Sequence, residues 1–205
     1  MAICEQGIQK ICDVPESILQ ILNKEVNNWD YINDTYQFDR VFGKHKCKSY
    51  FVDNASKGTT FPEQIVPVIE WIENIAGNNH KVIRCFLNAM EPNQSFNLHV
   101  DTRKLHILSR RLHIPVLIGE GCDYYTYRLN KQDTWDEYIF QMNYGNLYEL
   151  DNINPHNVKN KNGYRINLIA DVIDQDNMID DLTSIDTTQN DILSKIFKFG
   201  LPIST

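Results

Sequence analysis

Residues 109–129, SRRLHIPVLIGEGCDYYTYRL, contain two short runs of aliphatic and aromatic residues separated by a glycine-containing turn. Such runs, bounded by turn formers, are typical of antiparallel strands. Four more occur nearby: KVIRCFLN (81–88), FNLHVD (96–101), NLYEL (146–150) and YRINLIADVI (164–173). Because no helix of useful length is predicted between them, we expect residues 81–173 to be mainly β and to form a double-stranded β-helix, the jelly roll of cupin-like proteins.

The flanking segments have a different period. Apolar residues recur at helical spacing over residues 14–28 and 62–76, so residues 1–80 are expected to form a helical N-terminal part. After the β core, residues 174–205 are expected to be a polar linker followed by an amphipathic C-terminal helix over 184–200. A chain of 205 residues can form one well-buried domain but is too short for two large ones. We therefore expect a single domain, 1–205.

Composition narrows the possible partners. The net charge of −7 argues against a nucleic-acid binder, which would need a basic face, and the one basic cluster, GKHKCK (43–48), is interpreted as a solvated loop. Five scattered cysteines without a C-x-x-C pair predict neither a disulfide framework nor a zinc ribbon, and a reducing cytoplasm fits them best. No apolar run reaches membrane-spanning length, so no membrane partner is expected.

A constellation of metal-binding residue types lies in the second half of the chain. His99 and Asp101 occur in NLHVD (97–101), and His156 occurs in NINPHNV (152–158). Residues i and i+2 of a strand face the same side, so His99 and Asp101 can hold one metal ion. Two imidazoles and one carboxylate are the ligand set of a non-haem Fe(II) centre that keeps positions open for a co-substrate and O2. The H-x-D pair alone is a weak signal, and the distant His156 strengthens it.

Two arginines and a further histidine accompany this set. Arg165, a short way beyond the second candidate histidine, could hold an acidic co-substrate. Arg111 and His113 lie at strand spacing and so share one face of a predicted strand. An isolated His113 would more often be a core histidine bonded to a backbone carbonyl. Beside Arg111 and a candidate iron site, a ligand-binding role is the better interpretation.

Three stretches in order resemble a known family: FLNAMEPNQSFNLHVD (86–101), RRLHIPVLIGEGCDYY (110–125) and GNLYELDNINPHNVKNKNGYRINLIADV (145–172). Over roughly residues 80 to 173 the chain resembles the aspartyl/asparaginyl β-hydroxylase-like branch of the Fe(II)/2-oxoglutarate-dependent oxygenases. The resemblance implies that His99 and His156 are iron ligands and that Arg165 binds the distal carboxylate of 2-oxoglutarate.

The resemblance also assigns the neighbouring positions. It implies that Arg111 and His113 approach the metal-chelating end of 2-oxoglutarate. Asn88 falls where the animal protein hydroxylases of the family have a serine that assists the distal carboxylate. The chain departs from those enzymes at Asp101, where they carry glycine, and there it is similar to the free-proline hydroxylases, which have the full triad.

The function that the resemblance implies is a dioxygenase in a single catalytic domain. It would use Fe(II), 2-oxoglutarate and O2 to hydroxylate an amino acid, either free, such as proline, or an Asp, Asn or Pro residue in a peptide, and release succinate and CO2. One alternative is a non-catalytic jelly-roll protein that binds or senses 2-oxoglutarate or a metal. Another is a metal hydrolase, which is disfavoured because no general base is evident beside the triad.

Several polar residues near these motifs have more than one interpretation. Asp151, Asn152 and Asn154 are explained either as a turn or as residues that orient His156. Tyr124 is explained equally well as a pocket residue and as a strand residue. His106 has no partner pattern and is interpreted as structural or exposed.

Overall fold

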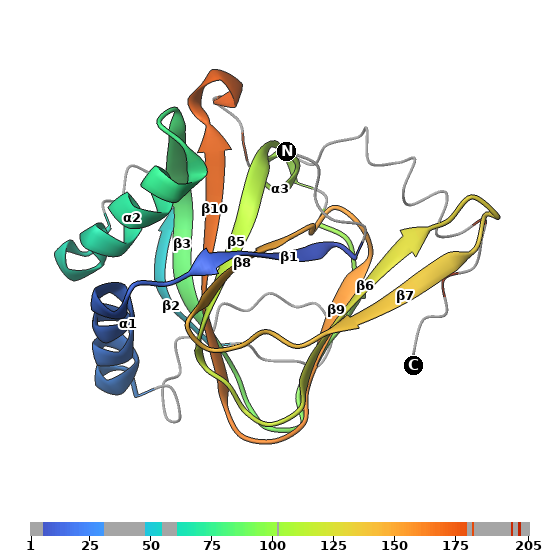
Figure 1. The fold of residues 1–205 in the computed structure, drawn as a ribbon, viewed down its shortest axis with the longest axis horizontal. Helices are drawn as coiled ribbons and strands as arrows, with labels where there is room; N and C mark the ends of the chain where they lie inside the picture. The colour runs from blue at the N-terminus through green and yellow to red at the C-terminus, as the bar shows by residue number, and fades with distance from the viewer. Residues whose placement is uncertain are drawn as a thin grey trace.

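Two antiparallel sheets form the body of the computed structural model, which describes residues 6–30, 48–54, 61–101, 103–179, 182, 198 and 201 (Figure 1). The large sheet has the order β1 (Ile8–Asp13), β8 (Asn146–Leu150), β5 (Ser109–Leu117), β10 (Arg165–Asp174), β3 (His80–Met90) and β2 (Lys48–Asn54). The small sheet has the order β4 (Ser95–His99), β9 (His156–Asn160), β6 (Cys122–Leu129) and β7 (Trp135–Phe140). The predicted jelly-roll architecture is confirmed, and all six predicted strands are present.

Two helices cover the outer face of the large sheet (Figure 1). They are α1 (Glu16–Asn28) and α2 (Val66–Ala76), which a 3-10 turn, Glu63–Ile65, precedes. Their apolar stripes pack on the outward-facing residues of β3, β5 and β10, among them Leu87, Leu112, Ile114, Ile166 and Leu168. This dry core forms because each helix carries its apolar residues on one face, as their helical spacing predicts.

The inner face of the large sheet is polar where the outer face is apolar. On β10 the side chains alternate, so that Ile166, Leu168 and Ala170 belong to the outer core while Arg165, Asn167 and Asp171 point the other way. These three polar residues are at most 3% exposed. Buried polar groups must find partners inside the protein, so the inner face is where a functional site is expected.

A second apolar cluster joins the two sheets. It combines Ile8, Met90 and Tyr148 of the large sheet with Tyr124 and Val158 of the small one. The fold thus packs the small sheet, which includes β4 and β9, against the inner face of the large sheet.

Residues 1–80 are not purely helical, and this part of the prediction was wrong. β1 pairs with β8 and β2 pairs with β3, so both strands extend the large sheet at its edges. In β1 only Ile8 is fully buried, and the weak alternation of such an edge strand leaves little pattern in a sequence. The expected helix over 184–200 lies outside the described residues, apart from Lys198, and so does most of the 43–48 cluster.

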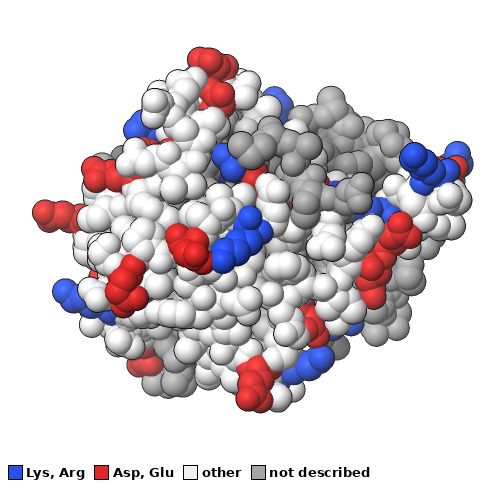
Figure 2. Space-filling view, viewed as in Figure 1, with Lys and Arg blue, Asp and Glu red and all other residues white. Residues whose placement is uncertain are grey.

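On the face shown in Figure 2, acidic and basic side chains are scattered singly and in small groups. The least exposed ion pairs, which join Arg84 and Arg111 to Asp171, lie inside the protein instead. In the part of the chain that the structure describes, no helix is long and apolar enough to cross a membrane.

Candidate functional site

His99 and His156 face each other across the two neighbouring strands β4 and β9. They are the last and first residues of these strands and are register partners in the antiparallel pair. Partners in such a pair point to the same side of the sheet. The two ring centroids accordingly lie 4.3 Å apart. The sheet register therefore brings together two predicted ligands that are distant in sequence.

A backbone carbonyl orients each imidazole. His99 Nδ1 donates to the Asn97 oxygen at 2.7 Å, and His156 Nδ1 donates to the Asn154 oxygen at 2.8 Å. A carbonyl only accepts, so Nδ1 carries the proton and Nε2 is the nitrogen left for a metal. Burial and, next, the neighbouring His99 lower the pKa of His156 to about 4, so this imidazole is neutral at pH 7.

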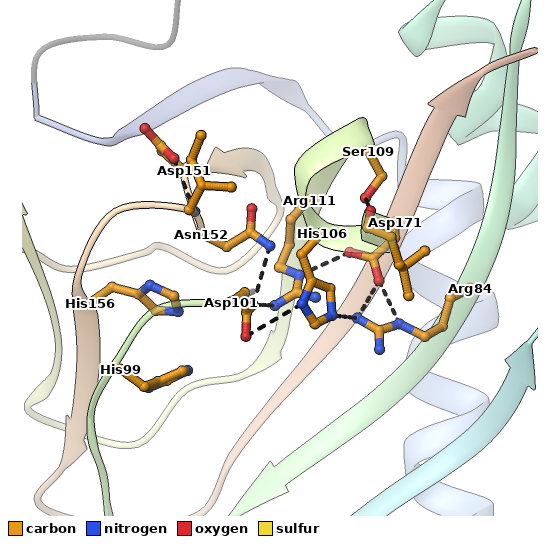
Figure 3. A network of polar contacts seen from close by, with 12 residues as sticks. Arg84, His99, Asp101, His106, Ser109, Arg111, Asp151, Asn152, His156 and Asp171 are labelled. Carbon is orange, nitrogen blue, oxygen red and sulfur yellow. Dashed lines mark hydrogen bonds and ion pairs between the residues drawn. The ribbon is translucent and has the colours of Figure 1, made fainter. Parts of the chain in front are cut away.

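The Asp101 carboxylate lies beside the two histidines, accepts hydrogen bonds from two side chains and faces a third (Figure 3). Its Oδ2 accepts from Arg111 Nη1 and from Asn152 Nδ2, the latter at 3.2 Å, while Oδ1 lies 3.6 Å from His106 Nδ1. The Asp101 backbone N–H also donates to the Asn152 oxygen at 3.1 Å. Burial, the largest single influence, opposes ionisation, but Arg111 together with the nearby histidines outweighs it and holds the pKa of Asp101 well below its usual range.

The donors at this place fit a divalent metal in kind, although they do not converge on one point. Among the described residues, no group of three or more His, Cys, Asp or Glu side chains has the arrangement of a metal site. Arg111 draws the carboxylate of Asp101 toward the large sheet. Two imidazole nitrogens and one ionised carboxylate nevertheless match the ligands that non-haem iron takes. The ligand set His99, Asp101 and His156 stays a prediction.

Behind Asp101 a closed ring of polar contacts joins Arg84, Asp171, Arg111, Asp101 and His106, which we call the charged ring (Figure 3). Arg84 Nε donates to Asp171 Oδ2 at 2.5 Å, and Arg111 Nε donates to Asp171 Oδ1 at 2.9 Å. Arg84 Nη2 lies 3.2 Å from His106 Nε2 and closes the ring. Burial would raise the pKa of Asp171, but Arg111 and Arg84 lower it to about 2.

The two predicted cofactor-binding residues on β5 have different surroundings. Arg111 bridges the carboxylates of Asp101 and Asp171. His113 is buried, with Nδ1 3.4 Å from the side-chain amide group of Asn167 and with Nε2 lacking a hydrogen-bond partner among the described residues. Burial and then Arg165 hold the pKa of His113 well below 6.5, so the ring is neutral.

Arg165 and Asn88, predicted to act on the same carboxylate, lie together on the inner face. Arg165 Nη1 donates to Asn88 Oδ1 at 3.2 Å, Nη2 donates to the Tyr124 hydroxyl, and the guanidinium carbon lies 5.0 Å from the centroid of the Tyr124 ring. With its amide oxygen toward Arg165 Nη2, at 2.8 Å, Asn167 also accepts from the Tyr124 hydroxyl. Asn88 and Tyr124 are neutral, so they orient the guanidinium without cancelling its charge.

Some of these contacts were not foreseen. Asn152 contacts Asp101, and Tyr124 contacts Arg165. The sequence had left two interpretations open for each of Asn152 and Tyr124. Asp171 had a detectable signal, because it lies an even number of residues from Arg165 and so on the same face of β10, a strand whose other face is apolar. His106 had none, since its place depends on α3 (Lys104–Leu108), a five-residue helix with no clear pattern. His106 is buried, and burial, then Arg111, lower its pKa to about 3.

The comparisons with known proteins support the fold. No family model matches the chain, and no curated protein is similar to it in sequence. A Trichoplax adhaerens prolyl hydroxylase, solved with a peptide of hypoxia inducible factor, is similar with a TM-score of 0.59 and 13% identity, over 84% of this chain and 86% of that one. A Pseudomonas putida prolyl-4-hydroxylase is similar with a TM-score of 0.53 and 13% identity, over 82% and 93%.

A third solved structure is the 2-oxoglutarate complex of a viral collagen prolyl hydroxylase from Paramecium bursaria Chlorella virus-1. It is similar with a TM-score of 0.51 and 9% identity, over 83% of this chain and 98% of that one. The chain therefore has the fold of the Fe(II)/2-oxoglutarate oxygenases, and the similar structures are mainly prolyl hydroxylases. This likeness does not single out the aspartyl/asparaginyl branch.

The buried histidines predict a pH-dependent stability of the metal-free protein. The unfolded pKa of histidine is about 6.5, whereas His106 and His156 have folded pKa values of about 3 and 4. Below pH 6.5 the unfolded chain takes up protons that the folded chain excludes, so stability falls as the pH falls toward the folded pKa. At pH 5 the loss is about 2 kcal/mol for each such histidine.

Urea unfolding at pH 7 and pH 5 measures this loss. The variant His106→Asn should lose less stability between the two pH values than the wild type. Asparagine does not titrate, so the unfolded variant takes up one proton fewer at pH 5. An identical loss in both proteins would contradict a buried neutral His106.

Proposed function

We propose that this protein is a dioxygenase that uses Fe(II), 2-oxoglutarate and O2 to hydroxylate an amino acid. The substrate is a free amino acid such as proline, or an Asp, Asn or Pro residue in a peptide, and the co-products are succinate and CO2. The observation that carries the proposal is the pair His99 and His156, which face each other with both Nδ1 atoms tied to carbonyls and both Nε2 atoms left for a metal. The oxygenase-like fold supports it.

In this proposal His99, His156 and Asp101 hold the iron. When bound, the iron with 2-oxoglutarate and O2 supplies the oxidising chemistry that yields succinate and CO2 and inserts oxygen into a C–H bond of the substrate. The chain's own task is to bind, orient and enclose the reactants. Asp101, held as an anion by Arg111, contributes the negative charge that the two neutral ligands lack.

Arg165 binds the distal carboxylate of 2-oxoglutarate in this proposal. A guanidinium offers two parallel N–H donors to a carboxylate, and such charge-assisted bonds are short and strong. Asn88 and Tyr124 fix the position of the guanidinium through its Nη atoms. His113, on the same face of the large sheet, has a buried Nε2 that is available to the other end of the co-substrate.

A second candidate function is a binding or sensing protein without turnover. The observation that favours it is the contact between Arg111 and Asp101, which holds the third donor away from a three-donor metal arrangement. Such a protein would bind 2-oxoglutarate or a metal and would form no succinate.

Succinate formation separates the two functions. We expect the purified protein with Fe(II), 2-oxoglutarate and air to form succinate, and to form more when the right substrate is present, because substrate binding couples decarboxylation to hydroxylation. The panel consists of free proline, other small amino acids, and peptides containing Asp, Asn or Pro, with the added oxygen followed by mass spectrometry. Anaerobic and iron-free reactions are the controls. Binding of Fe(II) and 2-oxoglutarate without succinate from any of them would favour the sensor.

A further inference from the structure

The charged ring contains two arginines and two carboxylates, whose charges alternate and cancel. Arg84 comes from β3, Asp171 from β10, Arg111 from β5, and Asp101 follows β4. The exposed fractions of these four side chains range from 0% to 13%. Enclosed ion pairs of this kind are costly to bury and seldom add stability beyond what apolar residues would give. A role in placing one of the four groups is therefore worth seeking.

The sharing of Arg111 is the unusual feature of the ring. Its Nε donates to Asp171 and its Nη1 donates to Asp101, so its fork is divided between two carboxylates. The preceding residue, Arg110, lies on the opposite face of the same strand, and its guanidinium serves a single carboxylate. Arg110 Nε and Nη2 donate to the two oxygens of Glu149, at 2.9 and 3.0 Å.

This division leaves one oxygen of Asp101 available. Oδ2 accepts from both Arg111 and Asn152. Oδ1 faces His106 Nδ1 at 3.6 Å, which is longer than a hydrogen bond. Since a guanidinium only donates, His106 Nε2 must accept from Arg84, and Nδ1 then carries the proton that points toward Oδ1. Without Asp171, the fork of Arg111 could take both Asp101 oxygens, as Arg110 takes those of Glu149.

We propose that Asp171, itself held by Arg84, is a positioning residue that divides Arg111 between two carboxylates and so keeps one oxygen of Asp101 for the metal ion. The inference rests on the proposed function, in which Asp101 is an iron ligand. It assigns a role in setting the metal affinity to Asp171 and Arg84, although neither residue contacts Asp101.

Metal binding by the purified, metal-free protein tests this directly, without turnover. Mn(II) or Co(II) is titrated anaerobically into the wild type and into Asp171→Asn, which keeps the shape of the side chain and removes its charge. We expect metal affinity to fall by about ten- to a hundredfold, the usual effect of losing a residue that orients a metal ligand. The Co(II) absorption spectrum should change as well, because one ligand is displaced.

Glu149→Gln is the matched control. Glu149 and Asp171 are both buried carboxylates paired with an arginine of β5, but on opposite faces of the sheet. Both variants should lose stability in urea, whereas only Asp171→Asn should lose metal affinity. An equal loss of affinity in the two variants would show that the effect comes from stability, and would overturn the proposal.

A second pair of variants tests the role of Arg111. If Asp171 acts by sharing Arg111, then Asp171→Asn should have little further effect on metal affinity in an Arg111→Met background. Residues that share a partner show such non-additive effects. Equal effects of Asp171→Asn in both backgrounds would overturn the mechanism.

A crystal structure of the wild-type protein with Mn(II) tests the same proposal should Asp171→Asn fail to fold. We expect Arg111 to contact both carboxylates while the metal lies on the Asp101 oxygen that does not accept from Arg111. A metal-bound structure in which Arg111 has left Asp101 would overturn the proposal. Failure of the wild type to bind any metal would overturn both this inference and the proposed function. Normal metal binding by Asp171→Asn would overturn this inference alone.

Discussion

Replacing His156 with alanine is expected to abolish tight Fe(II) binding and, with it, all succinate formation. The substitution removes a neutral imidazole whose Nε2 is the nitrogen left for the metal. It also leaves the Asn154 carbonyl without its donor, at a cost of about 1–3 kcal/mol, which is less than the roughly 5–15 kcal/mol stability of a typical domain. The variant should therefore stay folded. His99→Ala should have the same effect on the metal.

Anaerobic Fe(II) titration together with a urea unfolding curve measures both consequences. His80→Ala is a suitable control, because His80 begins β3 and is not among the predicted ligands. It should bind Fe(II) like the wild type. Unchanged Fe(II) affinity in both His99→Ala and His156→Ala would place the metal elsewhere or remove it from the function altogether.

The central strands could be predicted from the sequence because burial leaves a pattern in them. β10 is buried along almost its whole length and is recognisable as the apolar run RINLIADV. β7 was not predicted, since its residues are exposed or only half-buried and it pairs on one side only. Edge strands such as β1 and β7 are held mostly by backbone hydrogen bonds, which any sequence can make.

For the site, residue types could be predicted but not all of their contacts. The meeting of His99 and His156 depends on a register between β4 and β9 that no local pattern specifies. Arg111 was predicted to approach the co-substrate, and the structure shows it between Asp101 and Asp171. That contact requires β5 and β10 to pair with Arg111 beside Asp171, which is a property of the folded sheet.

Replacing Arg165 with alanine is expected to weaken 2-oxoglutarate binding by about ten- to a hundredfold, the equivalent of losing a charge-assisted hydrogen bond worth about 1.5–3 kcal/mol. Arg165 is only 3% exposed and contacts Asn88 and Tyr124, so its removal also leaves buried partners unsatisfied and lowers stability. Calorimetry on the Mn(II)-loaded protein measures the dissociation constant for 2-oxoglutarate. The constant of Arg165→Ala has to be compared with those of variants that separate the lost contact from the lost stability.

Two variants make that separation. Arg110→Ala removes an arginine with a buried partner from the outer face of the large sheet, so it should lower stability and leave the 2-oxoglutarate constant unchanged. Tyr124→Phe keeps the guanidinium and removes only the hydroxyl that fixes it, so its constant should lie between those of the wild type and Arg165→Ala. An unchanged constant in Arg165→Ala would move the anchor elsewhere, with Arg111 the next candidate. Because Arg111 already serves two carboxylates, a third would have to displace one of them, and Arg165 is therefore the better anchor.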